Sequence, residues 1–164
     1  MLRHPAIWAL VGGLWAAPMA HAAPRFTPPA GCEVQFTVQM HACQVANYYT
    51  CAGDAPGDTW ASFTDGSGEF FVSRTDAETR WIESISLADG EVDRLDAPAS
   101  ADNAAFSELL ASGRDDYDFV TRSSSGEVRR YIGHDALTGE SAVIDGVALE
   151  RCGFEMRVED EAGN

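Results

Sequence analysis

Regularly spaced turn signals restrict the fold of this chain more than any other feature. Glycine-containing turns recur roughly every 8–15 residues from residue 57 onward. Examples are Asp65–Gly68, Asp89-Gly90, Ser123–Gly126 and Asp145-Gly146. Between them lie short runs rich in β-branched and aromatic residues, which are typical of strands. The pattern predicts an all-β, mainly antiparallel domain, built as a β-sandwich or a small meander barrel.

The first of these strands has the cleanest alternation. Apolar side chains at Cys32, Val34, Phe36, Val38 and Met40 alternate with polar ones, the period of a strand with one buried face. The segment 43–51 continues with the same period, so we expect a hairpin that turns around residues 41–42. The strongest hairpin signal in the chain is the turn at 65–68, between the runs 60–64 and 70–74.

One segment departs from the strand pattern. Residues 102–112 place Phe106, Leu109 and Leu110 at helical spacing, and Gly113 follows where helices commonly end. We therefore expect one short amphipathic helix across an open side or end of the sheet. Its buried face would consist of the three apolar residues.

The N-terminus has the form of a secretory signal peptide over residues 1–22. Arg3 precedes an apolar run at 6–17, and Ala20-His21-Ala22 has the small-x-small pattern of a cleavage site. The run is shorter than the about 20 apolar residues that a membrane-spanning helix needs. We expect an exported protein, periplasmic or secreted, with no transmembrane segment in the mature chain.

The remaining boundaries follow from composition. Residues 23–31 contain three prolines and form a predicted linker, and residues 32–158 form a single antiparallel β domain. Residues 159–164 are either an acidic tail or the start of a truncated hairpin.

Charge limits the partners. The chain has 26 acidic residues against 11 basic ones, a formal charge of −15, and every basic residue apart from histidine is arginine. Nucleic acids and anionic lipids need cationic surfaces, so this balance argues against both. A small molecule or a protein partner remains open, and the sequence does not determine the oligomeric state.

Four cysteines in an exported chain predict two disulfides. Their gaps of 10, 7 and 100 residues do not fit a zinc site, and no other cofactor motif is present. In the expected hairpin Cys32 faces Cys51, whereas an extended segment 43–51 separates its two cysteines too widely for a bond. This reasoning pairs Cys32 with Cys51 and Cys43 with Cys152, provided that residues 43–51 are a strand.

The most suggestive candidate site is a group of aromatic residues in the middle of the chain. Trp60, Phe71 and Trp81 could form a cavity lining or a stacking surface, although core packing is the simpler explanation for such residues. We expect a non-enzymatic β domain that binds a small apolar ligand or a protein partner through these three residues.

The alternative function is a periplasmic hydrolase. Its acids would come from Asp115, Asp116 and Asp118, or its base from His134. No nucleophile motif supports this alternative, and His134-Asp135 are adjacent in the sequence, a poor arrangement for a catalytic triad.

Overall fold

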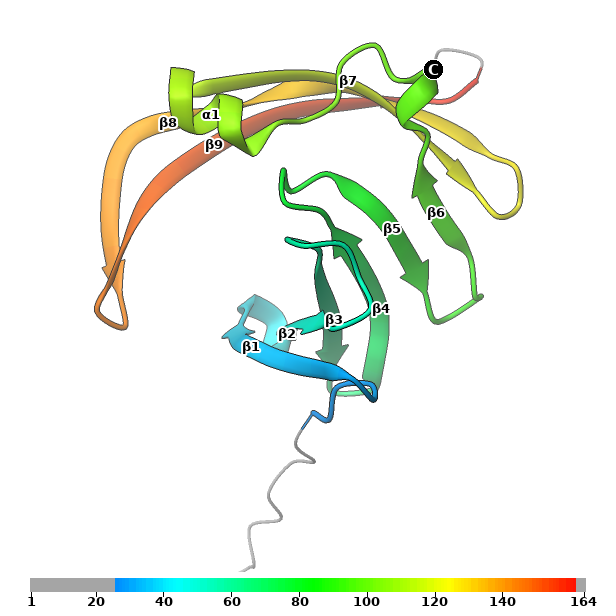
Figure 1. Cartoon of the computed structure of the whole chain (residues 1–164), viewed down its shortest axis with the longest axis vertical. Coiled ribbons are helices and arrows are strands. Elements are labelled where there is room, and N and C mark those ends of the chain that lie inside the picture. The colour runs from blue at the N-terminus through cyan, green and yellow to red at the C-terminus, as the bar shows by residue number, and fades with distance from the viewer. Residues whose placement is uncertain (1–25, 162–164) are drawn as a thin grey trace, which may run out of the picture.

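The computed structural model describes residues 26–161, which form one curled antiparallel sheet and a short helix. The sheet has nine strands, and their order in space is their order in the sequence. These are β1 (Cys32–Gln39), β2 (Val45–Cys51), β3 (Thr59–Asp65), β4 (Gly68–Thr75), β5 (Trp81–Ser86), β6 (Val92–Leu95), β7 (Arg114–Ser123), β8 (Val128–Ile144) and β9 (Val147–Glu159). Figure 1 shows the sheet curling into a half-barrel with β1 and β9 at its two edges.

The predicted fold class is therefore confirmed, and the half-barrel is closer to a meander barrel than to a sandwich. Each strand pairs with the next, which is the simplest way to connect antiparallel strands. Short connections join most neighbours, whereas the connection between β6 and β7 contains the helix. The predicted signal peptide at 1–22 and the first residues of the linker lie outside the described residues. Within 26–161, no helix is long and apolar enough to cross a membrane.

The turn between β8 and β9 illustrates how local chemistry sets the hairpins. Asp145 and Gly146 both have positive φ, 50° and 81°. A two-residue turn of this type matches the twist of the flanking strands, and Asp-Gly is one of its preferred sequences.

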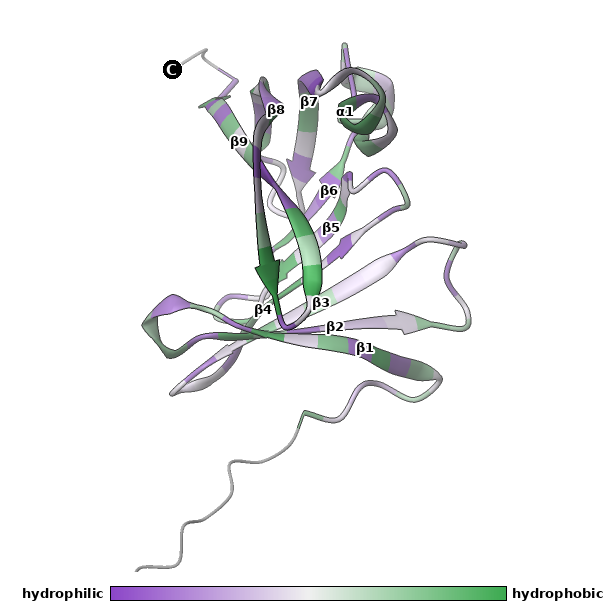
Figure 2. Ribbon diagram, turned by 90° about the vertical axis from the view of Figure 1, so that its left-hand side faces the viewer, coloured by the Kyte–Doolittle hydropathy of each residue, from purple (hydrophilic) through white to green (hydrophobic). Residues whose placement is uncertain are grey.

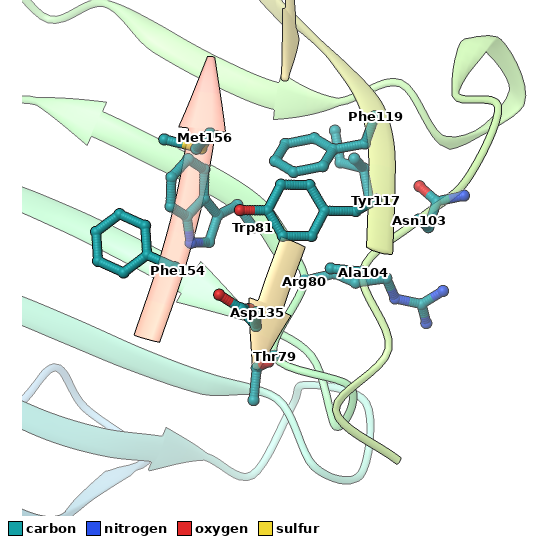
Figure 3. A pocket seen from close by; sticks show the side chains of 11 residues that line it. Thr79, Arg80, Trp81, Asn103, Ala104, Tyr117, Phe119, Asp135, Phe154 and Met156 are labelled. Atoms are coloured by element: carbon teal, nitrogen blue, oxygen red, sulfur yellow. The ribbon is translucent and has the colours of Figure 1, made fainter. Parts of the chain in front are cut away.

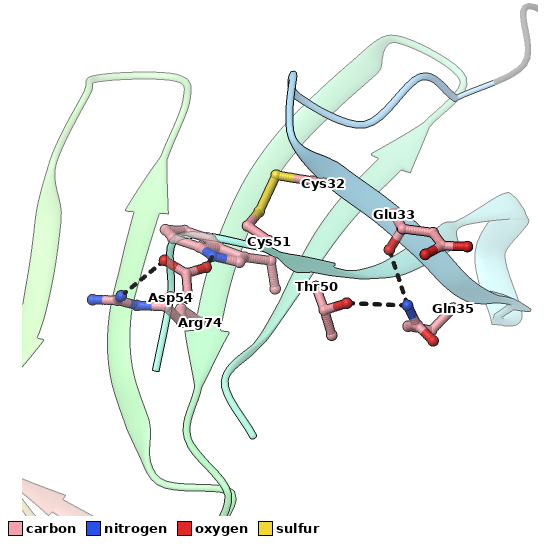
Figure 4. The surroundings of a disulfide bond; sticks show 8 residues. Cys32, Glu33, Gln35, Thr50, Cys51, Asp54 and Arg74 are labelled. Atoms are coloured by element: carbon pink, nitrogen blue, oxygen red, sulfur yellow. Dashed lines mark hydrogen bonds and ion pairs between the residues drawn. A yellow bond between two sulfur atoms is a disulfide. The ribbon is translucent and has the colours of Figure 1, made fainter. Parts of the chain in front are cut away.

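The β1–β2 hairpin confirms one of the two predicted disulfides. Cys32 is the register partner of Cys51, and their sulfur atoms are bonded (Figure 4). A β-bulge between Val34 and Phe36 shifts the register, so Val38 pairs with Ala46 and not with Val45. The hairpin is further held by the Gln35 amide, which donates to the Thr50 hydroxyl at 3.0 Å.

The second predicted disulfide, Cys43–Cys152, is wrong. Both residues are exposed and carry free thiols in the structure. Residues 41–43 form a 3-10 turn (η1, His41–Cys43) in which Ala42 and Cys43 have positive φ, so β2 begins only at Val45. Cys152 lies in β9, at the opposite edge of the sheet from the β1–β2 hairpin, and its thiol is not bonded to Cys43.

Helix α1 (Phe106–Ser112) is shorter than the predicted 102–112. Asp102 instead forms an isolated bridge with Asp118 of β7. Only Leu109 of the three expected apolar residues is buried, while Phe106 and Leu110 are exposed. The helix is docked at its start, where the Ser107 N–H donates to the Glu78 carboxylate at 2.9 Å.

The β8–β9 hairpin extends beyond the rest of the sheet. Ladder pairing between β7 and β8 ends at Arg114 and Ala136, and from there the hairpin continues as a two-stranded ribbon. Figure 2 shows this ribbon as a hydrophobic arm in front of the lower strands. Its tip exposes the apolar residues Val143, Ile144, Val147 and Leu149.

Candidate functional site

A cavity of about 230 Å³ lies on the concave face of the sheet. It takes side chains from β5, β6, β7, β8 and β9, together with loop residues before β5 and before α1 (Figure 3). Its lining consists of Thr79, Arg80, Trp81, Leu95, Asn103, Ala104, Tyr117, Phe119, Asp135, Phe154 and Met156. Strands β5 and β9 are not neighbours in the sheet, so their side chains can meet only on the inside of the curl.

The aromatic rings of Trp81, Tyr117 and Phe119 form one wall of this cavity, and Tyr131, which does not line it, contacts two of them. Phe119 and Tyr131 are register partners on β7 and β8, and their rings stack with centroids 4.9 Å apart. Trp81 meets both of them edge-on, at 5.9 Å and 5.7 Å. Tyr117, two residues before Phe119 and on the same face, is tilted against it at 5.6 Å. Edge-to-face and offset contacts of this kind hold rings in defined positions, so the wall is preorganised.

The opposite wall is open to solvent. Phe154 of the edge strand β9 is 72% exposed, and Met156 beside it is 38% exposed. Trp81 itself is 48% exposed, although it contacts two other rings. Large apolar side chains gathered around a cavity and left in water mark a surface that another molecule can cover.

Polar groups stand at one end of the cavity. The Asp135 carboxylate makes no hydrogen bond or ion pair within the described residues, whereas Arg80 is held by the Asp76 carboxylate, with Nε 2.7 Å from Oδ2. The Oδ1 atom of Asn103 has no hydrogen-bond partner in the described part of the chain. The cavity thus combines an apolar body with uncommitted polar acceptors.

A second carboxyl group, Asp115, is the register partner of Asp135. Asp115 is 2% exposed; one oxygen accepts the Ala105 N–H at 2.9 Å, and the other has no partner among the described residues. Burial raises the pKa of Asp115, against the opposing effect of that N–H. Burial and the neighbouring charge of Asp115 also raise the pKa of Asp135. The negative charge of Asp115 therefore disfavours the ionisation of Asp135, as a closely spaced carboxylate does.

These raised pKa values give an expected pH dependence of stability. An acid with a higher pKa in the folded protein stabilises the fold below its unfolded pKa of about 3.9, and this stability is lost as the pH rises through the folded pKa. We expect Asp115→Asn, which keeps an acceptor for Ala105, to lose less stability than the wild type between pH 4 and pH 7. Urea unfolding at several pH values measures this difference.

The neighbouring residue provides a control of opposite sign. Asp116 points to the other face, where hydrogen bonds from Arg114 lower its pKa. The ionised Asp116 carboxylate stabilises the fold above its unfolded pKa, and this stabilisation is lost as the pH falls through the folded pKa. The Asp116→Asn variant should therefore lose less stability in acid than the wild type does. If the free energy of unfolding changes equally with pH in Asp115→Asn and in the wild type, the pKa of Asp115 is not raised in the folded protein.

The three aromatic residues singled out in the sequence are divided between the two faces of the sheet. Trp81 lines the cavity, and Phe71 is on the same concave face without lining it. Trp60 is on the opposite face, where its indole N–H donates to Asp54 at 2.7 Å and Arg74 lies 5.2 Å from its ring centroid. The structure therefore does not gather the three residues at one site.

The acids considered for a hydrolase are also divided. Strand β7 alternates, so Asp115 faces inward while Asp116 and Asp118 face outward with His134, the register partner of Asp116. On that outer face Asp116 is paired with Arg114, and Asp118 with Arg130. Within the described residues no group of three His, Cys, Asp or Glu side chains is placed to hold a metal ion.

Trp81 is the one lining residue that was anticipated; those that were missed include Tyr117, Phe119, Asp135, Phe154 and Met156. Their signal is present locally, because residues 117 and 119, and likewise 154 and 156, alternate with charged or β-branched neighbours in strand-like runs. What the pattern does not show is that the sheet curls far enough for these strands to face Trp81.

Comparison of the chain with known protein families, curated proteins and solved structures finds no match. A function is therefore proposed from the geometry of the site.

Proposed function

We propose that this protein is an exported, non-enzymatic binding module that holds a small apolar ligand in the concave cavity. The observation that carries the proposal is the preformed aromatic wall of Trp81, Tyr117 and Phe119 facing an exposed Phe154 across a cavity. The disulfide between Cys32 and Cys51 supports an oxidising compartment, as export requires.

The size of the cavity supports a small ligand. A dry engineered cavity of about 150 Å³ accepts benzene. The 230 Å³ found here suits a somewhat larger molecule, such as one aromatic ring with a short chain. A ligand in this position would cover Phe154 and Trp81 and remove their apolar surface from water, which supplies the driving force for binding.

A hydrolase receives less support. Catalysis needs acid and base groups that converge on one substrate atom. The sheet separates Asp115 from Asp116, Asp118 and His134, and the first two of the outward-facing groups are neutralised by arginines.

Titration with 4-phenylbutan-1-ol, a neutral ring with a short chain, tests the proposal. We expect saturable binding in calorimetry, with one site per chain. Phe154→Ala should weaken binding roughly ten-fold, because the lost apolar contact contributes about 1.5 kcal/mol to the binding free energy. Because Phe154 is mostly exposed, its replacement should leave the unfolding transition almost unchanged.

Phe36→Ala is the matched control. Phe36 is also an exposed phenylalanine on an edge strand, but it stacks on Tyr48 and does not line the cavity. Its variant should bind as the wild type does. Equal effects of the two substitutions, or no saturable binding by the wild type, would refute the proposed site.

A further inference from the structure

We propose that the ligand is an organic cation, with an apolar body among the aromatic rings and a primary ammonium group beside Asp135. This inference rests on the proposed function and specifies the class of ligand that the cavity takes. Figure 3 shows Asp135 next to Tyr117, Phe154 and Trp81, at the polar end of the cavity.

The first argument is that Asp135 lacks a cation. Many carboxylates of this protein pair with an arginine, including Asp54, Asp58 and Glu83 around Arg74. The carboxylate of Asp135 has neither an ion pair nor a hydrogen bond within the described residues. The arginine that shares its cavity, Arg80, is already paired with Asp76 at 2.6 Å. A half-buried carboxylate without a partner is costly, and a bound ammonium would compensate it.

The second argument comes from the rings. The faces of tryptophan and tyrosine attract cations, and the attraction strengthens where water is excluded. Elsewhere in the same molecule this combination occurs with its cation in place: Arg74 lies over Trp60 and pairs with Asp54, 3.7 Å away. The cavity offers an equivalent tryptophan and carboxylate in Trp81 and Asp135, without an arginine over the ring.

The third argument is that the charged groups around Asp135 favour a cationic ligand. From β7 the groups facing Asp135 are the acid Asp115 and the hydroxyl of Tyr117; from β9 the nearest titratable group on this face is Cys152. Arg80 approaches from the β4–β5 loop together with its partner Asp76, so that pair adds little net charge. His134, the neighbour of Asp135 in β8, faces outward and lowers the pKa of Asp135, but by less than Asp115 raises it. With a chain charge of −15, the field at the cavity favours cations and disfavours carboxylate ligands.

Three probes of nearly equal shape test this assignment: 4-phenylbutylamine, 4-phenylbutan-1-ol and 4-phenylbutyrate. We expect the amine to bind roughly ten-fold more tightly than the alcohol, the size of one charge-assisted hydrogen bond. The carboxylate should bind most weakly. Because protonation of Asp135 competes with the ammonium, the affinity for the amine should fall in acid while that for the alcohol stays constant.

Asp135→Asn should remove the preference for the amine and leave the alcohol affinity within about two-fold. Asp145→Asn, at the tip of the β8–β9 hairpin, has the same change in charge away from the cavity and should keep the preference. If the alcohol binds and the amine has no advantage, or Asp135→Asn retains that advantage, the assignment fails while the binding function stands. If none of the three probes binds, the proposed function itself fails.

Discussion

Gly133→Ala is expected to destabilise the protein by about 3 kcal/mol, at the upper end of what an overfilled site usually costs. Gly133 of β8 is the register partner of Met156 on β9. A Cβ atom at Gly133 would lie 2.0 Å from the backbone oxygen of Glu155 and 2.9 Å from the Cα of Met156. Both are backbone atoms, which cannot rotate away as a side chain could, so β9 has to move.

The same shift should affect the cavity. Phe154 and Met156 form its open wall from β9, and Gly133 lies between them and Tyr117 of β7 in the ladder. We therefore expect Gly133→Ala to weaken the binding of 4-phenylbutan-1-ol as well as to lower the urea midpoint. The free energy of unfolding from urea titration is the primary measurement.

Gly153→Ala is the matched control in the same strand pair. A Cβ at Gly153 would meet only the Cγ2 methyl of Thr138 at 3.7 Å, an ordinary van der Waals contact, and its φ is not positive. The unfolding free energy of this variant should remain within about 0.5 kcal/mol of the wild type. If the two alanine variants unfold alike, the close approach of β8 and β9 at Gly133 is not a constraint on the fold.

Removal of the Cys32–Cys51 disulfide, by replacing both residues with serine, is expected to cost about 3 kcal/mol. The bond closes a loop with a sequence separation of 19. The loss of this cross-link increases the entropy of the unfolded chain by an amount worth about 3 kcal/mol for a loop of this length. The bond also holds β1, which lies at the edge of the sheet and pairs only with β2.

Urea unfolding of the double serine variant measures this effect, and the wild type in a thiol reductant should behave in the same way. Replacing Cys43 and Cys152 by serine is the control; these thiols are free and exposed, so stability should hardly change. A loss of stability in the control equal to that of the Cys32/Cys51 variant would mean that the second pair is also bonded in solution.

Much of the fold could be predicted from the sequence because its signals are local. The alternation from Cys32 to Met40 and the turns at 65–68 and 145–146 specify strands and hairpins between neighbouring segments. The partnership of Cys32 with Cys51 belongs to the same class, since it depends only on the register of one hairpin.

The separation of Trp60 from Phe71 shows where local reasoning fails. In the β3–β4 hairpin, Thr64 pairs with Glu69 but Phe63 pairs with Phe71, because a bulge adds one residue on β4. A shift of one residue reverses the face of every side chain beyond it. Without the bulge, Phe71 would lie opposite Ser62 on the face of Trp60.

By itself the sequence determined an antiparallel all-β domain, the approximate place of the helix and the disulfide of the first hairpin, because period, turn chemistry and register act over a few residues. Only the tertiary structure decided that Trp81 faces Phe119 and that Phe154 and Asp135 share its cavity. The curl that brings β5 near β9 is the summed twist of the strands between them, to which every strand and bulge contributes. No short segment encodes that sum, and the candidate site depends on it.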